Sequence, residues 1–367
     1  MTLRVGIVSA GWGAFAHLPA WRAIPGVEVT AICTSRQETA EAAQARLGLP
    51  RAFWNASEMC ADPQIDIVDL GTRPNVRLPM VLAALENAKH IYNASPHAPD
   101  WAGAKAIDAA MGQGTSVGVV DAFARWIPAH RQMAALLAED TIGAPLGGTC
   151  HFNVSLFNAP NRQFPYNWFA DADAGVSAMR NNGSHVLYLL LELFGPVAEL
   201  VADDRQVLKQ WVFPDGGRIV PETTDCGTAI LRFASGLSLQ LQASWSMPAY
   251  SGWLVDVFGS KGRLVARSPT FPTARDCTLH LGEVGGTLEE VAIPDHFRVV
   301  PGIELDWQAA IQPSFPMALS MHAMVETIGG KGQASPDFTA ALEIERVQEA
   351  IRVSNAERRW VRLEEVV

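Results

Sequence analysis

Short runs of aliphatic and β-branched residues alternate with alanine-rich amphipathic stretches over the first 120 residues. Strands that are apolar along their whole length and separated by helices are typical of a parallel sheet buried on both faces. The pattern therefore predicts an α/β, Rossmann-type N-terminal domain over 1–122. Its expected strands are 3–8, 27–33, 65–70, 90–93 and 116–120, and its expected helices start near residue 12 and cover 38–47, 77–88 and 101–113.

After Asp121 the pattern changes, and strands follow one another without helices between them. Turn residues at 234–236 and 259–262 predict two antiparallel hairpins, and apolar and polar residues alternate over 237–244. We expect an α+β domain over 123–367 with an open, mainly antiparallel sheet. Its last helix, over about 336–355, should begin at Ser335-Pro336-Asp337 and pack back toward the Rossmann domain. Other expected elements are a helix over 128–139 and strands over 151–156, 228–233, 253–258 and 263–266.

Composition narrows the class of protein. A chain of 367 residues exceeds the roughly 250–300 that one core supports, and a charged fraction of 18% indicates a well-packed globular protein. The net charge of -10 without basic clusters argues against nucleic acid as a partner. No apolar run approaches the ~20 residues that span a bilayer, so we expect a cytoplasmic protein away from membranes. The five cysteines are scattered and give neither disulfide framework nor metal spacing, so no metal is expected.

The turn after the first strand has the small residues that a dinucleotide needs. Ser9, Gly11 and Ala14 take the three positions of a degenerate GxGxxG/A fingerprint, with Trp12 and Gly13 in the same turn. Small residues allow a tight turn and let backbone N–H groups at a positive helix N-terminus approach the pyrophosphate. This turn predicts a dinucleotide-binding site.

The end of the second strand bears on which dinucleotide binds. An Asp or Glu there would bind the ribose 2′-hydroxyl of NAD, whereas Thr34, Ser35 and Arg36 offer hydroxyls and a guanidinium suited to a 2′-phosphate. NADP is therefore favoured over NAD. The alternative is that Arg36 is a solvated loop cation or stacks on the adenine.

Several segments carry a resemblance to a known family. They are 14–20, 83–91, Gly183-Ser184-His185, 258–262 and 359–361. On these segments the chain resembles the Gfo/Idh/MocA dehydrogenases over nearly its whole length. The resemblance implies a C-terminal domain whose open sheet binds substrate and partner subunits, and hence a homodimer or homotetramer. Residues 9–12 and 33–38 are most similar to the branch that includes the yeast galactose repressor, in which some proteins bind a dinucleotide without known turnover.

Two positions depart from the family pattern. The resemblance implies a Glu-Lys-Pro strand end, often with a cis peptide, whose Lys contacts nicotinamide and the reacting hydroxyl; here Ser95 precedes Pro96. It also implies an Asp four residues before a His, where this chain has Asn181 and His185. A helical period of about 3.6 residues places Asn181 and His185 on one face. An Asp would raise the pKa of the imidazole, whereas an Asn only orients it. Both charged members of the usual relay are therefore missing.

The candidate site follows from these positions. His185 is the expected acid/base, with Ser95 and Asn181 as positioning groups, and His97 can substitute for the missing Lys. The alternatives are a hydrogen-bonded core histidine for His185 and a solvent-facing helix residue for His97. Further cofactor contacts are expected from the ends of the third and fourth strands, at Thr72, Pro74, Asn75, Asn93 and Pro96.

Aromatic and arginine residues suggest where a substrate binds. The loop over 158–173 contains Arg162, Tyr166 and Trp168, which suit a sugar or polyol because aromatic faces pack on C–H surfaces and arginine bonds to hydroxyls or carboxylates. Arg125 lies where the chain leaves the Rossmann domain. The alternatives are a surface loop with an anchoring tryptophan and, for Arg125, an interdomain ion pair.

These features lead to one main hypothesis and two alternatives. The main hypothesis is an NAD(P)-dependent oxidoreductase that acts on a hydroxyl or carbonyl of a sugar, cyclitol or related polyol. The second is a lyase or glycosidase that recycles its cofactor within one catalytic cycle. The third, favoured by the absent Lys and Asp, is a non-catalytic dinucleotide or sugar sensor.

Overall fold

The computed structural model describes residues 2–112, 114–163, 167–300, 302–308 and 313–367. The chain divides into two units. Unit 1 holds Met1–Phe123 and Val300–Leu342, and unit 2 holds Ala124–Val299 and Glu343–Val367.

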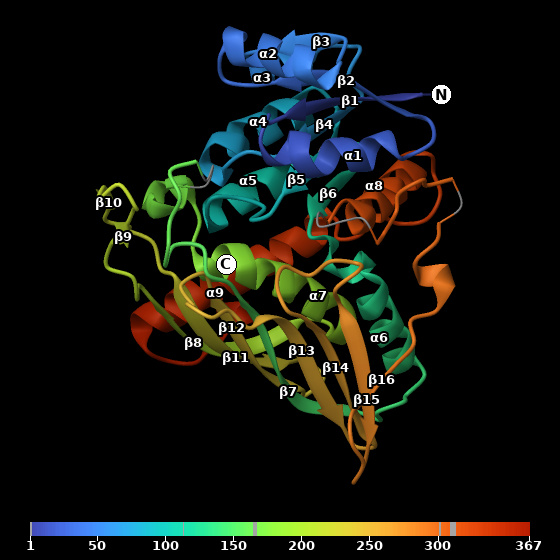
Figure 1. Cartoon of the computed structure of the whole chain (residues 1–367), viewed down its shortest axis with the longest axis vertical. Helices are drawn as coiled ribbons and strands as arrows, with labels where there is room; N and C mark the ends of the chain where they lie inside the picture. Colours follow the sequence, from blue (N-terminus) through green and yellow to red (C-terminus); the bar gives the residue numbers. More distant parts are fainter. Residues whose placement is uncertain (1, 113, 164–166, 301, 309–312) are drawn as a thin grey trace. The chain divides into compact units, whose positions relative to one another are not determined.

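Unit 1 is built on a six-stranded sheet in the order β3-β2-β1-β4-β5-β6 (Figure 1). Each neighbouring pair is parallel. The chain order reverses between β1 and β4, which is the switch point at which doubly wound sheets bind ligands. The strands are β1 (Leu3–Val8), β2 (Val27–Cys33), β3 (Arg51–Phe53), β4 (Ile67–Leu70), β5 (His90–Ala94) and β6 (Gly118–Asp121).

Helices cover both faces of this sheet. Successive residues of a strand point to opposite faces. Asp69 of β4 accepts a hydrogen bond from Trp21 of α1. Gly6 of β1 pairs with Val68, the residue before Asp69, so it lies on the other face of the sheet. There it is next to Met59 of α3. Helices α1 and α3 therefore lie on opposite faces, as the predicted Rossmann arrangement requires. The helices of unit 1 are α1 (Leu18–Arg22), α2 (Gln37–Leu47), α3 (Ala56–Ala61), α4 (Pro74–Glu86), α5 (Trp101–Met111) and α8 (Ser314–Ile328).

A segment from late in the chain completes unit 1. Helix α8 packs against α1 and β6, and Ser314 donates to the Ala16 carbonyl at 3.1 Å. Farther on, the Val120 amide donates to the Pro336 carbonyl at 2.9 Å. The expected second domain over 123–367 therefore differs from unit 2, because the contacts of residues 300–342 assign them to unit 1.

The last helix begins later than the sequence predicts. The Pro336 carbonyl already accepts a hydrogen bond from β6, and Asp337 forms a bridge with Val119, so these residues extend the edge of the sheet. The Asp337 carboxylate then caps the helix by accepting from the Ala340 amide at 2.8 Å. Helix α9 consequently covers Phe338–Glu357 and begins in unit 1 and continues in unit 2.

Unit 2 contains a nine-stranded sheet in the order β16-β15-β14-β13-β7-β12-β11-β8-β17. Strands β7 and β12 are parallel, and their other neighbours are antiparallel. The predicted hairpins β11–β12 and β13–β14 are confirmed. The strands are β7 (Pro145–Asn153), β8 (Val197–Arg205), β11 (Cys226–Phe233), β12 (Ser238–Ser244), β13 (Gly252–Gly259), β14 (Gly262–Ser268), β15 (Thr278–Glu283), β16 (Glu289–Glu290) and β17 (Val361–Arg362), with β9 (Trp211–Val212) and β10 (Arg218–Ile219) as a separate pair.

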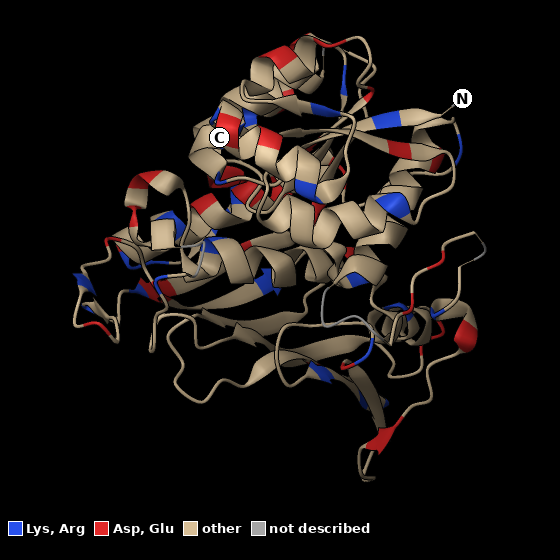
Figure 2. Ribbon diagram, turned by 45° about the horizontal axis from the view of Figure 1, so that its top comes forward, with Lys and Arg blue, Asp and Glu red and all other residues tan. Residues whose placement is uncertain are grey.

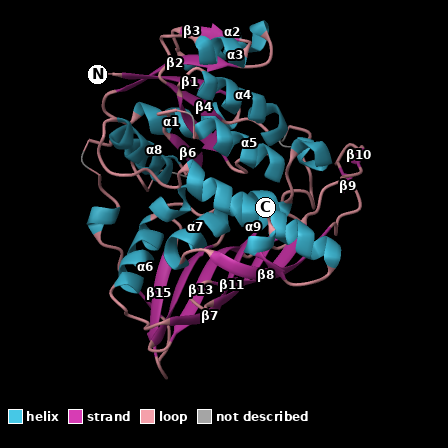
Figure 3. Cartoon of the chain, turned by 180° about the vertical axis from the view of Figure 1, so that it is seen from behind, coloured by secondary structure: helices cyan, strands magenta, loops and turns pink. Residues whose placement is uncertain are grey.

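Three helices lie along one face of the nine-stranded sheet: α6 (Pro128–Ala138), α7 (Ser184–Phe194) and the unit 2 part of α9 (Figures 1 and 3). The alternation predicted along β12 agrees with this arrangement. Leu239 and Leu241 are fully buried, whereas Gln240 between them is exposed. One face of the sheet is thus the apolar core of unit 2, and the other face carries polar side chains.

Charged residues of both signs are interspersed along the described parts of each unit (Figure 2). Among the described residues, no helix has the length and apolar character needed to cross a bilayer.

Candidate active site

The turn after β1 is shaped by two glycines and a serine. Ser9 has a φ of +140°, in a region that favours glycine, and its hydroxyl accepts from the Gly11 amide at 3.2 Å. A Cβ on Gly13 would lie 2.7 Å from Ile7 Cγ2, so the close approach to β1 requires glycine. Gly11 is exposed, and Ala14 is buried in the π-helical turn Gly13–His17 that follows. The Gly11 backbone is therefore open to a ligand at the start of this turn.

The end of β2 presents two side chains to solvent. The Thr34 hydroxyl is engaged within the loop, where it lies 2.6 Å from the Thr39 hydroxyl and donates to the Arg36 carbonyl at 3.0 Å. Ser35 and Arg36 are exposed. Thr34 therefore shapes the loop, while Ser35 and Arg36 are the side chains available to a nucleotide.

Arg77 of α4 ties together the ends of β4 and β5. This side chain is 1% exposed and donates to the carbonyls of Thr72, Pro96 and, at 2.8 Å, Ala94. The Ser95–Pro96 peptide is cis, as the family resemblance implied. Sequence reasoning missed Arg77, for which the signal is a single arginine on the buried face of an apolar helix.

His97 lies beside Asn93 in the interior of unit 1. The Asn93 amide donates to His97 Nδ1 at 3.0 Å and to the His97 carbonyl at 2.9 Å. The His97 ring is 2% exposed and packs edge-on against Phe338 at 4.5 Å. Burial, and then the charge of Arg77, lowers the pKa of His97 to about 3. The imidazole is thus neutral and, contrary to expectation, neither faces solvent nor supplies the missing lysine's charge. It holds Asn93 in place.

Three buried acceptor atoms at these strand ends have no hydrogen-bond partner within the described part of the chain. They are Asn75 Oδ1, Asn93 Oδ1 and Ser95 Oγ. Asn75 follows Pro74, which begins α4. Because buried polar groups almost always have partners, these atoms point to a ligand with hydrogen-bond donors. The amide and hydroxyl groups of a nicotinamide nucleotide are such donors, so the residues of this edge fit that cofactor.

A buried ionic network lies on the α1 face of the same sheet. Both ring nitrogens of His17 meet carboxylates, with Nδ1 at 2.8 Å from Asp69 and Nε2 at 2.9 Å from Asp121. Trp21 donates to Asp69 at 2.6 Å and Tyr92 donates to Asp121 at 3.1 Å. An imidazole with a carboxylate at each nitrogen is doubly protonated, so His17 is a cation held between two anions.

Charge explains this protonation state. Burial alone would lower the pKa of His17, but the charges of Asp69 and then Asp121 outweigh burial and raise that pKa to about 10. Trp12 of the cofactor turn also donates to Asp121, at 3.2 Å, so the network reaches the predicted nucleotide site. Sequence reasoning noted His17 only as a family landmark. The available signal was an aspartate in each of two otherwise apolar strands.

In unit 2, the candidate base stands at the start of α7. His185 is half-buried and its ring lies edge-on to Phe152 at 6.4 Å and to Phe271 at 6.3 Å. Asn181 lies in the π-helical turn Met179–Gly183 that precedes α7, so the regular helical period assumed from the sequence is wrong here. Turns of this kind occur frequently at functional sites.

Helix α9 fixes this π-helical turn. The Gln348 amide donates to the Met179 carbonyl at 2.9 Å and to the Ser184 hydroxyl at 3.0 Å. Glu345, which is 1% exposed, pairs with Arg180 at 2.7 Å. The backbone on both sides of Asn181 and at the first residue of α7 is therefore held from α9. Sequence reasoning located this helix but missed its buried polar residues Glu345 and Gln348.

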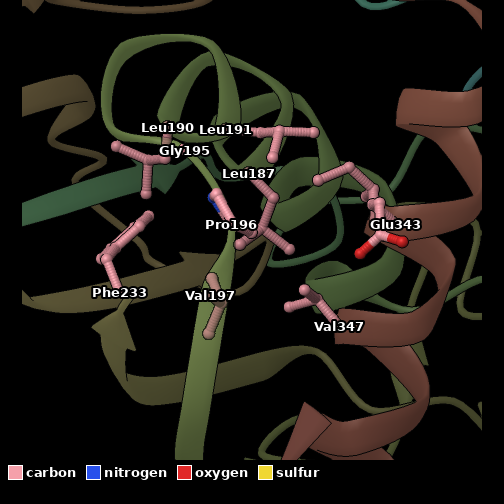
Figure 4. A pocket seen from close by; sticks show the side chains of 10 residues that line it. Leu187, Leu190, Leu191, Gly195, Pro196, Val197, Phe233, Glu343 and Val347 are labelled. Carbon is pink, nitrogen blue, oxygen red and sulfur yellow. The ribbon is translucent and has the colours of Figure 1, made fainter. Parts of the chain in front are cut away.

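The C-terminal half of α7 packs against apolar side chains (Figure 4). A cavity of about 10 Å³ remains there, close to the smallest space that holds one water. Leu187 and Leu191 of α7 line it together with Val347 of α9, and Glu343 is the charged side chain among the lining residues. The face of α7 that packs on Val347 therefore serves packing, and this cavity offers no space for a substrate.

Arg125 pairs with Glu192 of α7 at 2.8 Å and lies over the Trp126 ring at 5.0 Å. Both partners belong to unit 2, so this ion pair is not the interdomain pair considered as an alternative.

The predicted substrate loop is partly described. Arg162 pairs with the exposed Asp215 at 3.1 Å, and its guanidinium lies 3.9 Å from the Phe213 ring centre. Trp168 is half-buried and packs against an apolar cluster of unit 2. Tyr166 lies outside the described residues. Substrate contacts from Arg125, Arg162, Tyr166 and Trp168 stay predictions.

Two family profiles match the chain. The profile described as "Oxidoreductase family, NAD-binding Rossmann fold" matches residues 3–119, and that described as "GFO/IDH/MocA C-terminal domain" matches residues 130–265. The chain belongs to the Gfo/Idh/MocA oxidoreductase family. The expected family, fold class and dehydrogenase activity are thereby confirmed, and the cofactor is a nicotinamide dinucleotide.

Named relatives of this Gfo/Idh/MocA oxidoreductase include sugar dehydrogenases. D-apiose dehydrogenase of Paraburkholderia graminis is 28% identical over 78% of this chain and 72% of its own. Levoglucosan dehydrogenase of Pseudarthrobacter phenanthrenivorans is 23% identical over 98% of this chain and 97% of its own.

Solved structures share the fold. A levoglucosan dehydrogenase in complex with NADH and L-sorbose has a TM-score of 0.88 at 21% identity, with 99% of both chains covered. An NAD-binding oxidoreductase of Klebsiella pneumoniae has a TM-score of 0.87 at 24% identity, with both chains covered completely.

Proposed function

We propose that this protein transfers a hydride between NADP(H) and a hydroxyl or carbonyl group of a sugar, cyclitol or related polyol. The observation that carries the proposal is the half-buried His185 at the start of α7, directly after a π-helical turn that α9 holds in place. The names of two relatives, D-apiose dehydrogenase and levoglucosan dehydrogenase, support the substrate class.

The residues of the chain divide the chemistry between them. Bound nicotinamide would accept the hydride that leaves the carbinol carbon. His185 accepts the proton of the same hydroxyl, so that the C–O bond becomes a carbonyl, and it returns the proton in the reverse direction. Ser95 and Asn181 are neutral and orient groups by hydrogen bonds, and His97 positions Asn93. Arg77 holds the strand ends on which Ser95 and Asn93 lie.

The chain lacks the Lys and Asp of the family pattern. Proton removal is still catalysed, but by a different group. Neither Ser95 nor Asn181 stabilises a developing alkoxide by charge, so proton removal depends on His185 alone. Restoring the charge with Ser95→Lys should raise kcat/KM if the site has kept dehydrogenase geometry. A matched lysine at exposed Ser57 of α3 should leave proton removal unaffected. No gain in Ser95→Lys over the Ser57 control would contradict the proposed role of position 95.

NADP is the proposed dinucleotide because Ser35 and Arg36 are exposed in the loop that follows β2 and a guanidinium suits a 2′-phosphate. Titration of the protein with NADPH and NADH should show tighter binding of NADPH. Arg36→Gln should weaken NADPH about tenfold and leave NADH nearly unchanged, whereas Arg46→Gln, at an exposed position of α2, should change neither. Tighter binding of NADH to the unaltered protein would overturn the preference.

One assay separates the proposal from its alternatives. The protein is incubated with NADP+ or NAD+ and a panel of sugars and polyols, starting with D-apiose and levoglucosan, while reduced nicotinamide is followed by absorbance. Net reduction supports the proposal. Product release without net reduction indicates the recycled cofactor of a lyase or glycosidase. Tight cofactor binding without turnover of any panel member indicates a sensor.

A further inference from the structure

A second cavity in unit 2 lies between α6 and α7, away from the start of α7. It measures about 190 Å³. Its charged lining residues are Arg125, Arg131 and Glu192, and apolar walls come from Leu189, Leu193 and Phe297. His185 does not line it, so this cavity is separate from the site proposed for hydride transfer.

The charges around this cavity do not cancel. Arg125 gives both of its terminal nitrogens to the two oxygens of Glu192, at 2.9 and 2.8 Å, and this pair is neutral. Arg131 is half-buried, its guanidinium lies 4.8 Å from the Phe297 ring centre, and no carboxylate among the described residues pairs with it. One positive charge is therefore left without a counterion.

The other titratable group of the lining adds no charge. His130 is completely buried; its Nδ1 donates to the Ala124 carbonyl at 2.6 Å and its Nε2 accepts from Trp253 at 3.1 Å. Burial lowers the pKa of His130 to about 4, so the ring is neutral near pH 7. Burial also lowers the pKa of Arg131, and the neighbouring Arg125 adds to this effect. A bound anion would offset both effects on the Arg131 cation.

We propose that this cavity binds a small organic monocarboxylate with an aliphatic body, whose carboxylate is held by Arg131. One uncompensated guanidinium matches one carboxylate, which it can contact through two parallel N–H groups. An engineered apolar cavity of about 150 Å³ binds benzene, so about 190 Å³ suits a short branched carboxylate of slightly larger size. The leucines and the phenylalanine ring suit a hydrocarbon body better than a hydrated inorganic anion. The proposal does not depend on hydride transfer.

Calorimetric titration of the full-length protein at fixed ionic strength tests this site. The probe is 3-methylbutyrate, and its controls are the uncharged 3-methylbutyramide and inorganic phosphate. We expect heat of binding with 3-methylbutyrate only. Arg131→Leu should weaken binding about ten- to a hundredfold, because a charge-assisted hydrogen bond is lost, and Arg46→Gln should bind as the unaltered protein does.

A second variant tests the site without removing a charge, and it keeps the test valid if Arg131→Leu does not fold. Ala135→Leu extends a half-buried lining residue of α6 into the cavity while keeping both arginines, and it should abolish binding of 3-methylbutyrate. Unchanged binding in either Arg131→Leu or Ala135→Leu would overturn the site, as would absence of binding to the unaltered protein. Binding of phosphate or of the amide as tight as that of 3-methylbutyrate would overturn the ligand class.

Discussion

At the scale of single residues, the chain buries an ionic network in the core of the Rossmann sheet. His17 is a buried cation between Asp69 and Asp121, and Asp121 also bonds to Trp12 of the cofactor turn. Replacing His17 by a neutral residue therefore removes the charge that compensates two buried carboxylates, which typically costs about 3–5 kcal/mol.

This network predicts how stability depends on pH. The pKa of His17 is about 10 in the folded chain against an ordinary 6.5, so above pH 6.5 the folded state holds a proton that the unfolded state has lost. The free energy of unfolding should therefore fall by up to about 1.4 kcal/mol per pH unit from there upward. Urea unfolding up to about pH 7.5, below the ordinary cysteine pKa of about 8.5, measures this slope.

Below pH 6.5, the dependence of the free energy of unfolding on pH has the opposite sign. The pKa of His97 is about 3 and that of His130 about 4 in the folded chain, so below pH 6.5 the unfolded state binds the extra protons and stability rises with pH. A maximum near pH 6.5 follows. His17→Gln should flatten the alkaline limb and keep the acid limb. An alkaline limb that is equally steep in His17→Gln would refute the assigned imidazolium.

How much of the site the sequence predicts depends on whether the residue lies in a local motif. Gly11, Gly13, Pro96 and His185 belong to short patterns and can be located by inspection. The partners of His17 cannot, because Asp69 lies 52 and Asp121 104 positions farther along the chain. Only the parallel register of β4 to β6 brings them together.

At the scale of elements, the π-helical turn before α7 is the feature on which the position of His185 depends. Hydrophobic periodicity does not reveal this turn, because its five residues, Met179–Gly183, are too few to show a period. It is held by Gln348 and Glu345, which come from α9 near the end of the chain. The sequence therefore predicts the helix and not its irregular start.

Gln348→Leu is expected to act on catalysis through position. The variant keeps the size of the side chain but cannot donate to Met179 and Ser184, so the start of α7 loses two hydrogen bonds. We expect kcat to fall about tenfold or more with the Kd of the cofactor unchanged. Steady-state kinetics and cofactor titration measure the two effects.

The control for this experiment is Gln37→Leu, at an exposed position of α2, which should change neither quantity. Gln348→Glu retains an acceptor and loses the donor, so it should not rescue kcat. A parallel loss of cofactor affinity and kcat in Gln348→Leu would indicate general destabilisation instead of a positioning role.

Most regular elements follow from local pattern, and the exceptions have physical reasons. The strands over 3–8 and 27–33 occur as predicted. Strand β3 and helix α3 were missed, because a three-residue strand and a six-residue helix are too short to show a period. Helix α4 begins earlier than expected because Pro74 can occupy its first turn.

At the scale of the whole molecule, the division into units was harder to predict than the folds themselves. Residues 300–342 return to unit 1, where α8 covers α1 and β6. Sequence order alone favours assigning a contiguous segment to each domain. Only tertiary contacts show that the chain returns.

The helix-free face of the nine-stranded sheet leads to a prediction about assembly. Ile230 of β11 and Phe258 of β13 are 42% and 46% exposed, and the strand register puts both on this face. A homodimer or homotetramer that covers them should become monomeric when both are changed to Lys. Light scattering after gel filtration measures the mass. A mass that is the same for the unaltered protein and the double variant would contradict this interface.

The central claim is that His185 supports hydride transfer in a site without the family Lys and Asp. The most direct test uses polyols and sugars deuterated at their carbinol carbons, with mass spectrometry of the nicotinamide cofactor after incubation with the protein. We expect deuterium in the reduced cofactor with the unaltered protein and none with a His185→Ala variant that still binds the cofactor. Equal labelling with His185→Ala would contradict this claim. So would unaltered protein that is saturated with cofactor and transfers no deuterium to it from any substrate.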